Sequence, residues 1–359
     1  MLMNTLKRKK MKAVVKYGQE NGMVELREVD IPKIGPNDVL LEVKAAGICG
    51  SDIEMWRHHF TYKVNTPVIQ GHEFCGVIVE VGEGVKGYHE GDKVISETSA
   101  YVCGKCRFCR SGFYNMCPDR LGYGYGTDGA FTNYVKVRQE ILHRMPDSLS
   151  FEEAALTEPV CVAYNAVIAR SRVMPGDTVV IIGPGPIGLC CLQIARIAGA
   201  SRIIVSGTAA DHKRLESAAE MGADITINSE QDDAVAQVLA LTDGVGADLV
   251  VDCAGSSITL KQSLEMVRRL GQITKIGWGP KPVNMSLDLL LSKSATLQGT
   301  YGHHWSIWKQ VITLLEKGMV RTGSLVSTVL PVSDWENAFN LVEKKKVVKA
   351  ILTPIPIDD

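Results

Sequence analysis

Residues 178–188, TVVIIGPGPIG, join a run of β-branched residues to a glycine-rich turn. The run Thr178–Gly183 is typical of a strand buried on both faces, because it is continuously apolar rather than alternating. The apolar segment Pro186–Ala198 that follows is long enough to form a helix. The stretch therefore predicts a strand, a tight turn and a helix in immediate succession.

The glycines of the turn recur with G-x-G-x-x-G spacing. Gly183 permits the tight turn, Gly185 lets the backbone approach a pyrophosphate, and Gly188 lets the helix pack on the strand. The first helical N–H groups, with the positive end of the helix dipole, then face the phosphates. We expect a dinucleotide site that also includes Pro186 and Ile187.

The alternation of apolar strands and helices continues beyond this turn. We expect a helix over 212–221 and strands at 202–206, 225–228, 247–253, 272–276 and 296–299. Continuous Val/Ile strands that alternate with helices predict a parallel sheet covered on both faces. Residues 161–301 are therefore expected to form a Rossmann-type, doubly wound α/β domain.

Residues 1–160 have a different pattern, in which Gly, Pro and Asn separate short strands expected at 12–16, 39–43, 76–81 and 93–96. This pattern predicts a β-rich, partly barrel-like domain. Residues 302–359 are expected to complete it, because 349–354 reads as a strand that returns to the first domain. A helix over 305–317 carries Trp305 and Trp308 at helical spacing, and we expect both to pack inward.

The dinucleotide's ribose should meet the end of the second strand of this domain. An NAD site usually has an acidic residue there, but this chain has Gly207, and Asp211 comes four residues too late. Without that carboxylate a 2′-phosphate is not repelled, and its candidate contacts are Ser206, Thr208, Lys213 and Arg214. NADP is slightly favoured, but NAD stays open because a shifted loop would also explain Gly207.

Four cysteines follow one another with C-x2-C-x2-C-x7-C spacing at Cys103, Cys106, Cys109 and Cys117. One short loop with four thiolates suits a tetrahedral, closed and therefore structural zinc site. A disulfide framework is the alternative, but the other six cysteines are scattered through a long chain. A nucleic-acid-binding zinc ribbon is disfavoured by the composition described next.

Composition narrows the function classes. The chain has 359 residues, 45% hydrophobic and 22% charged, with a net charge of −1. The length predicts two domains, and the charge gives no indication of nucleic acid or an acidic membrane as partner. No apolar run approaches the ~20 residues that span a bilayer. No apolar segment follows the basic residues 7–10, so we expect a cytoplasmic protein whose first ten residues are an extension before the fold.

Two further segments contain potential metal ligands: GICGSD at 47–52 and GHEFCG at 71–76. Alone, Cys49 and His72 would read as ordinary buried residues. Together with the cysteine loop and the glycine turn, in this order, the segments resemble the zinc-dependent medium-chain alcohol/polyol dehydrogenase family. The resemblance extends from Met11 to Pro354, and it implies a GroES-like β-rich catalytic domain.

The resemblance implies a catalytic zinc held by Cys49, His72 and Glu73, with Glu158 as a fourth ligand or a replacement for water. With the cysteine loop, that makes two zinc ions per subunit. Alcohol dehydrogenases usually have cysteine at the place of Glu158, and glutamate resembles the sorbitol and threonine dehydrogenase branches. Cys161 is three residues from the matching position, and we interpret it as a core thiol.

The resemblance also implies the remaining catalytic roles. Ser51 matches the family's hydroxyl relay, and Asp52 matches the acid that orients the imidazole of His72. The relay often ends in a histidine, but this chain has Glu54 there, with His58 or His59 as alternatives. Hydride would pass from the substrate carbon to the nicotinamide, in a cleft between the two domains.

The substrate is less well specified. Glu158 and Trp56 favour a polyol or other polar secondary alcohol. A sugar-alcohol phosphate is an alternative, for which Arg120, Lys275 or His303 could bind the phosphate. A zinc-free enone or quinone reductase and a non-enzymatic relative are disfavoured because all the metal ligands are present. The resemblance further implies a homodimer or homotetramer, with 295–301 as the edge strand through which the sheets join.

Overall fold

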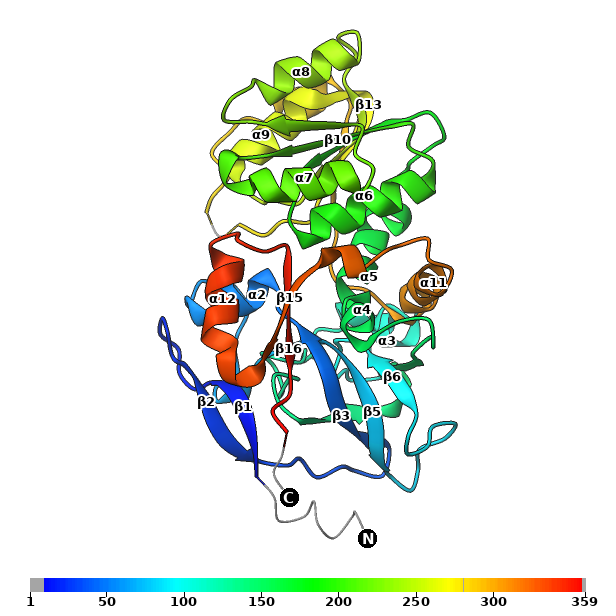
Figure 1. The fold of residues 1–359 in the computed structure, drawn as a ribbon. Coiled ribbons are helices and arrows are strands. Elements are labelled where there is room, and N and C mark those ends of the chain that lie inside the picture. Colours follow the sequence, from blue (N-terminus) through cyan, green and yellow to red (C-terminus); the bar gives the residue numbers. More distant parts are fainter. Residues whose placement is uncertain (1–9, 280, 357–359) are drawn as a thin grey trace. The chain divides into compact units, whose positions relative to one another are not determined.

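The computed structural model describes residues 10–279 and 281–356, and it consists of two compact units (Figure 1). Residues up to 158 and from 304 onward form the first unit, and residues 159–303 form the second. The expected N-terminal extension lies outside the described residues, except that Lys10 already belongs to the first strand.

The second unit is built on a six-stranded parallel sheet of order β11-β10-β9-β12-β13-β14. Its strands are β9 (Thr178–Ile182), β10 (Arg202–Gly207), β11 (Ile225–Asn228), β12 (Ala247–Asp252), β13 (Val267–Lys275) and β14 (Thr296–Gly299). The strands predicted from the sequence are confirmed, as is the doubly wound α/β class. The strand order changes direction between β9 and β12, and in such sheets a crevice opens at the carboxyl ends of the strands there.

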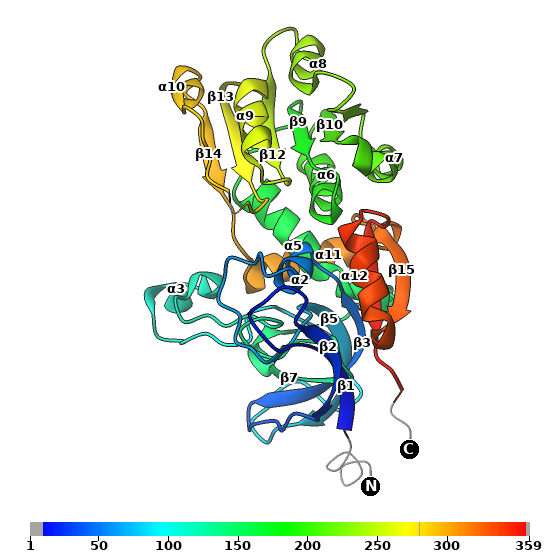
Figure 2. The same ribbon diagram turned by 90° about the vertical axis from the view of Figure 1, so that its left-hand side faces the viewer.

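The helices of this unit are α6 (Pro186–Ala198), α7 (His212–Glu220), α8 (Ala234–Leu241), α9 (Ser257–Met266) and α10 (Asp288–Ser292). Figure 2 shows α6 and α7 beside β9 and β10, and α10 next to β14 at the far edge of the sheet. Buried aliphatic residues such as Val180, Ile204 and Val250 form the core between sheet and helices. None of the helices within residues 10–279 and 281–356 combines the length and apolarity needed to cross a bilayer.

The first unit is β-rich, as predicted. A small sheet has the order β2-β1-β4, and a larger one has the order β15-β16-β3-β5-β6-β8, with β7 also paired to β3. The bounds are β1 (Lys10–Lys16), β2 (Val24–Asp30), β3 (Asp38–Gly47), β4 (Val68–Ile69), β5 (Glu73–Val81), β6 (Lys93–Ser96), β7 (Tyr134–Arg138), β8 (Leu142–Arg144), β15 (Val326–Pro331) and β16 (Lys349–Thr353). The expected C-terminal strand is therefore β16, which returns to pair antiparallel with β3 (Figure 1).

The helices of the first unit are α2 (Gly50–Trp56), α3 (Arg107–Arg110), α4 (Phe151–Ala155), α11 (Trp305–Glu316) and α12 (Trp335–Glu343), and α5 (Thr157–Tyr164) leads into the second unit. Trp308 is fully buried, but Trp305 is 45% exposed, so the expectation that both pack inward was wrong for Trp305. Three residues rotate an α-helix by about 300°, so Trp305 lies about 60° around the axis from Trp308, and it begins the helix where little covers it. Trp56 is a core residue, packed edge-on against Trp335 and Phe339, rather than part of an open substrate pocket.

Candidate active site and metal centres

The first candidate metal centre forms where β3 and β5 lie side by side. Gly47, the last residue of β3, is paired with Glu73, the first residue of β5. Cys49 follows the end of β3 and His72 precedes the start of β5, so the register places both next to Glu73. One ligand atom each of Cys49, His72 and Glu73 lies within 4.8 Å of the others. A thiolate, an imidazole and a carboxylate suit zinc.

The carboxylate of Glu73 has a buried partner that the sequence did not indicate. Lys349, at the start of β16, places its Nζ 2.7 Å from Glu73 Oε1 and 2.6 Å from Oε2. Both side chains are almost completely buried. Gly47 leaves the space for this pair, because a Cβ there would lie 2.2 Å from Glu73 Oε2. The only indication of this pair in the sequence was that Lys349 begins a strand that is otherwise apolar.

Asp52, in the first turn of α2, lies next to this cluster. Its Oδ2 accepts a hydrogen bond from the backbone N–H of Cys49 at 2.8 Å, and its Oδ1 lies 3.8 Å from Nδ1 of His72. These two facing atoms, Oδ1 and Nδ1, are buried without a hydrogen-bond partner. Asp52 is therefore placed on the side of the imidazole where the expected orienting acid would stand.

The electrostatics of the cluster favour a cation. Burial disfavours a charge on His72, but Asp52, Cys49 and Glu158 outweigh it and raise the pKa of His72 to about 10. Burial also raises the pKa of Glu73, against the opposing charge of Lys349. The acidic groups Asp52, Glu73 and Glu158 and the thiol of Cys49 thus lie close together, with Lys349 as counter-charge. The donor set and its charge fit a divalent metal.

The other expected active-site residues are distributed around the cluster. Glu158, in the first turn of α5, is 8% exposed and lies outside the 4.8 Å group, although its charge raises the pKa of both His72 and Glu73. Ser51 is half-buried in the first turn of α2. Glu54 is exposed, with its Oε2 3.9 Å from Nδ1 of His59. Ser51 and Glu54 are three residues apart and share one helix face.

The four cysteines of the loop form the second candidate centre. Their sulfurs all lie within 4.8 Å of one another, with Cys106 to Cys109 at 3.5 Å and Cys103 to Cys109 at 4.0 Å. Tetrahedral zinc with Zn–S bonds of ~2.3 Å requires sulfurs about 3.8 Å apart. Backbone N–H groups of Lys105 and Cys106 lower the pKa of Cys103 to about 7, which favours a thiolate. The loop fits a zinc ion with four cysteine ligands.

A buried carboxylate beside this loop was not anticipated from the sequence. Glu97, just after β6, accepts a hydrogen bond from the hydroxyl of Tyr114 at 2.6 Å, and its other oxygen lies 2.9 Å from Nε2 of His143. The His143 ring stacks on Trp308 of α11 at an interplanar angle of 7°. Tyr114 lies between the last two cysteines of the loop, so Glu97 connects the loop to the barrel.

The candidate dinucleotide site has the local geometry that the glycine pattern predicts. Gly183 has a φ of +99°, a conformation that few other residues adopt. A Cβ on Gly188 would lie 2.0 Å from the carbonyl oxygen of Gly183, so the close helix–strand approach needs glycine. Gly185 caps α6, Pro186 is its first residue, and Ile187 follows in the first turn. The exposed N–H groups of this turn can receive phosphate.

The end of β10 places the candidate ribose contacts. The backbone N–H and hydroxyl of Thr208 both donate to Asp211 Oδ2. Arg214 is 8% exposed, with Nη1 3.5 Å from Asp211 Oδ1, so its charge is paired inside the fold. Ser206 is also buried, and a Cβ on Gly207 would lie 2.9 Å from Pro184. Of the expected contacts, Ser206 and Arg214 are thus buried, Thr208 is half-buried and Lys213 is exposed.

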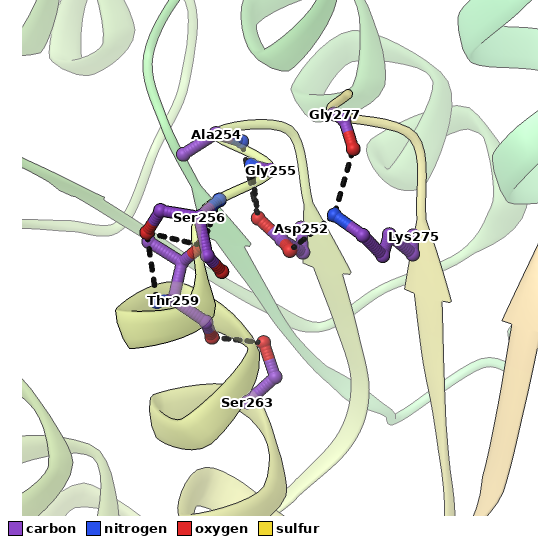
Figure 3. Close-up of polar contacts among 8 residues, drawn as sticks. All are labelled: Asp252, Ala254, Gly255, Ser256, Thr259, Ser263, Lys275 and Gly277. Carbon is purple, nitrogen blue, oxygen red and sulfur yellow. Dashed lines mark hydrogen bonds and ion pairs between the residues drawn. The ribbon is translucent and has the colours of Figure 1, made fainter. Parts of the chain in front are cut away.

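Two adjacent strand ends, of β12 and β13, are joined by a polar network shown in Figure 3. Asp252 is fully buried, and its Oδ1 accepts hydrogen bonds from the backbone N–H groups of Ala254 and Gly255. Lys275 Nζ lies 3.4 Å from Asp252 Oδ2 and donates to the carbonyl oxygen of Gly277 at 2.7 Å. The network fixes both loops at the crevice edge of the sheet, where such folds bind ligands.

Comparisons with known proteins agree with this geometry. Residues 35–147 match the alcohol dehydrogenase GroES-like domain, and residues 186–317 match the zinc-binding dehydrogenase domain. The chain belongs to the zinc-type medium-chain alcohol dehydrogenase family. The resemblance identified from the sequence motifs is thereby confirmed, and the protein is an oxidoreductase.

Individual relatives of this dehydrogenase cover nearly its whole length. It is 38% identical to sorbitol dehydrogenase of Halalkalibacterium halodurans over 96% of this chain and 100% of the relative. It is 35% identical to D-arabitol-phosphate dehydrogenase of Enterococcus avium over 97% and 99% of the two chains. The crystal structure of a zinc-binding dehydrogenase from Sinorhizobium meliloti bound to NADP superimposes with a TM-score of 0.88, at 29% identity, over 97% and 100% of the chains.

Proposed function

We propose that this dehydrogenase is a zinc-dependent polyol dehydrogenase that oxidises a secondary alcohol to the ketone with NAD(P). The convergence of Cys49, His72 and Glu73, of which Glu73 is fully buried, with Glu158 nearby, is the observation that carries the proposal. In this proposal residues 1–160 with 302–359 hold the metal and substrate, and residues 161–301 bind the dinucleotide. The sorbitol dehydrogenase relative supports a polyol as substrate.

Zinc, when bound, supplies the positive charge that lowers the pKa of the substrate alcohol. Asp52 orients the imidazole of His72 through its carboxylate, which faces Nδ1. Ser51 accepts the alcohol proton, and Glu54, one turn further along α2 and exposed, passes it to solvent directly or through His59. The glycine turn and the network around Asp252 would hold the dinucleotide, which would supply a hydride acceptor at that edge of the sheet.

The cysteine loop holds a second zinc in this proposal, so each chain binds two. The loop offers four sulfurs and no position for a substrate, so that site is structural. All ten cysteines are free thiols, which suits a reducing compartment and supports a cytoplasmic location.

We further propose that NADP is accepted as well as NAD. The end of β10 carries no acid at Gly207, and the nearest acid, Asp211, is held by Thr208 and Arg214. Lys213 is exposed beside this loop and is the candidate contact for a 2′-phosphate, since Arg214 is already paired. The NADP-bound relative supports the assignment.

The oligomer is proposed to form through β14. This strand is one of the two edge strands of the parallel sheet in the described part of the chain, β11 being the other. Exposed leucines surround it: Leu270 at 74%, Leu287 at 46%, Leu289 at 38%, Leu291 at 75% and Leu297 at 37%. An unpaired edge beside an apolar surface favours association with a second copy, as a homodimer or within a homotetramer.

The test is absorbance of the reduced nicotinamide with polyols such as sorbitol, with NAD or NADP, before and after chelation. We expect activity that disappears on chelation and returns with zinc. Lys213→Gln should lower kcat/KM for NADP while NAD serves as the internal control. Turnover that is indifferent to metal would instead place the protein with the zinc-free enone or quinone reductases.

A further inference from the structure

A cavity of the first unit, whose lining contains none of the metal-ligand candidates, is strongly basic. Its volume is about 250 Å³, and it lies between β1, the end of α2 and the segment 58–64. Lys16, Lys63 and His58 line it, together with Gln19 and aromatic rings. No acidic residue of the described chain contributes to this lining. The cavity therefore presents positive charge without internal neutralisation.

Lys16 is the unusual member of this group. It is 1% exposed, and within the described residues the only hydrogen bond of its side chain is the one that Nζ donates to the backbone carbonyl oxygen of Glu20 at 2.5 Å. No carboxylate in the described residues forms an ion pair with it. Burial lowers its pKa, and no neighbouring acid opposes that effect. A buried ammonium group normally has a charged partner, so this one lacks an anion.

The rest of the cavity wall is held in place by the fold. The Gln19 amide donates to the carbonyl oxygen of Val64 and to the hydroxyl of Thr66. Phe60 packs on Tyr62 and Tyr125 with ring centroids 5.5 and 5.6 Å apart. His58 has a φ of +58°, an unusual conformation for a residue with a side chain. The basic side chains thus extend from an ordered frame.

We propose that this cavity binds the phosphate monoester at the far end of a phosphorylated polyol, with Lys16, Lys63 and His58 as its contacts. The inference rests on the proposed polyol dehydrogenase function and specifies its substrate class. A phosphate monoester carries a charge of −1.5 to −2 at neutral pH and offers strong acceptor oxygens, which match ammonium and imidazole donors.

The distance along α2 suits such a substrate. Met55 lines the cavity and follows the metal-ligand candidate Cys49 by six positions. At 1.5 Å per helical residue, about 9 Å separates them along the axis. That separation is comparable to the length of an extended sugar alcohol with a terminal phosphate.

The residues that the sequence suggested for a phosphate are engaged elsewhere. Arg120 donates to the hydroxyls of Ser99, Thr98 and Tyr125. Lys275 belongs to the second unit and is bound by Asp252 and the carbonyl oxygen of Gly277. His303 is 2% exposed.

Calorimetric titration of the full-length zinc-loaded protein tests the proposal without requiring turnover. The probes are a sugar-alcohol phosphate, the same unphosphorylated polyol and inorganic phosphate, at equal ionic strength in chloride. The phosphorylated polyol should bind at least about tenfold more tightly than the free polyol, since a charged hydrogen bond contributes that much or more. Lys16→Met and the exposed Lys63→Gln should each reduce this preference about tenfold or more.

Lys33→Gln is the matched control, because Lys33 is exposed and lies outside the cavity lining, and it should leave the preference unchanged. Equal affinity for the two polyols, or a preference that survives both cavity variants, would overturn the proposal. Tight binding of inorganic phosphate, with no preference between the two polyols, would assign the cavity to free phosphate. That result would also overturn the proposal. Tight, variant-sensitive binding without any turnover would support the phosphate site while contradicting the dehydrogenase function on that substrate.

Discussion

Lys349 and Glu73 are 276 residues apart in the sequence, yet their side chains form a buried ion pair with an N–O distance of 2.6 Å. The pair joins β16, at the end of the chain, to β5, beside the candidate catalytic metal. Removing one partner of a buried pair leaves an uncompensated charge in an apolar environment. Lys349 therefore supplies the counter-charge that opposes the effect of burial on the pKa of Glu73, and it fixes the carboxylate beside Cys49 and His72.

Lys349→Met is expected to lower the free energy of unfolding by about 3–5 kcal/mol, because Glu73 would remain buried without its counter-charge. Urea unfolding of the metal-free protein measures the effect without a contribution from metal binding. The double variant Lys349→Met/Glu73→Gln is the control and should recover most of the loss, since neither charge remains. A single variant as stable as the parent would show that the pair contributes little.

The cysteine loop should account for one zinc ion per chain. Cys109→Ser removes one of four sulfurs, so we expect metal analysis to fall from two zinc ions to one. The control is Cys75→Ser, which replaces a buried thiol outside both metal clusters. If Cys109→Ser retains two ions, the loop does not hold the second zinc.

Tyr114→Phe tests the connection between the loop and the barrel. Burial and the nearby Glu97 carboxylate raise the pKa of Tyr114, so its hydroxyl stays protonated and donates to Glu97. Without this donor a buried carboxylate oxygen is unsatisfied, at a cost of about 1–3 kcal/mol in denaturant unfolding. Tyr101→Phe, at a 50% exposed ring, is the matched control and should change stability little.

The ion pair between Arg57 and Glu343 should make stability depend on acid pH. Arg57 donates to both carboxylate oxygens of Glu343 at 2.6 Å, and this lowers the pKa of Glu343 from 4.5. Because the folded pKa is the lower one, the stabilisation is complete above the unfolded pKa and is lost as the pH falls through the folded pKa. Both side chains are about one-third exposed, so the contribution is at most about 1 kcal/mol.

Glu343→Gln should therefore reduce stability at neutral pH and make little difference in strong acid. Urea unfolding of parent and variant, at neutral pH and well below 4.5, measures both differences. A difference in the free energy of unfolding between parent and variant that grows toward acid pH would contradict a lowered pKa of Glu343.

The edge strand β14 should determine whether copies of this chain associate with one another. Leu297→Lys places a charge on the edge strand, where charged residues oppose strand pairing between chains. We expect light scattering after gel filtration to show a smaller species than the parent forms. Val245→Lys, at a 62% exposed position before β12, is the control and should leave the mass unchanged. An unchanged mass for Leu297→Lys would exclude β14 as the contact.

Contiguous motifs explain why much of this protein could be predicted from its sequence alone. The turn of Gly183 and Gly188, the helix that begins at Pro186, and the cysteine loop each depend on neighbours a few residues apart. Backbone sterics and ligand spacing act over that range, so local sequence is sufficient to predict their conformation. The parallel sheet followed from the continuous apolar strands, whose period indicates burial on both faces.

Contacts between distant segments required the tertiary structure. Periodicity indicates that a side chain is buried, but it does not identify what covers it, so Trp56 and Trp305 were assigned to the wrong environments. The partners of Glu73 and Glu97, and the basic cavity around Lys16, depend on which strands pair and in which register. β3 lies between β5 and β16, and that arrangement brings Lys349 to Glu73. The candidate metal ligands and the glycine turn could thus be identified from the sequence, whereas the charges that surround them were decided by long-range packing.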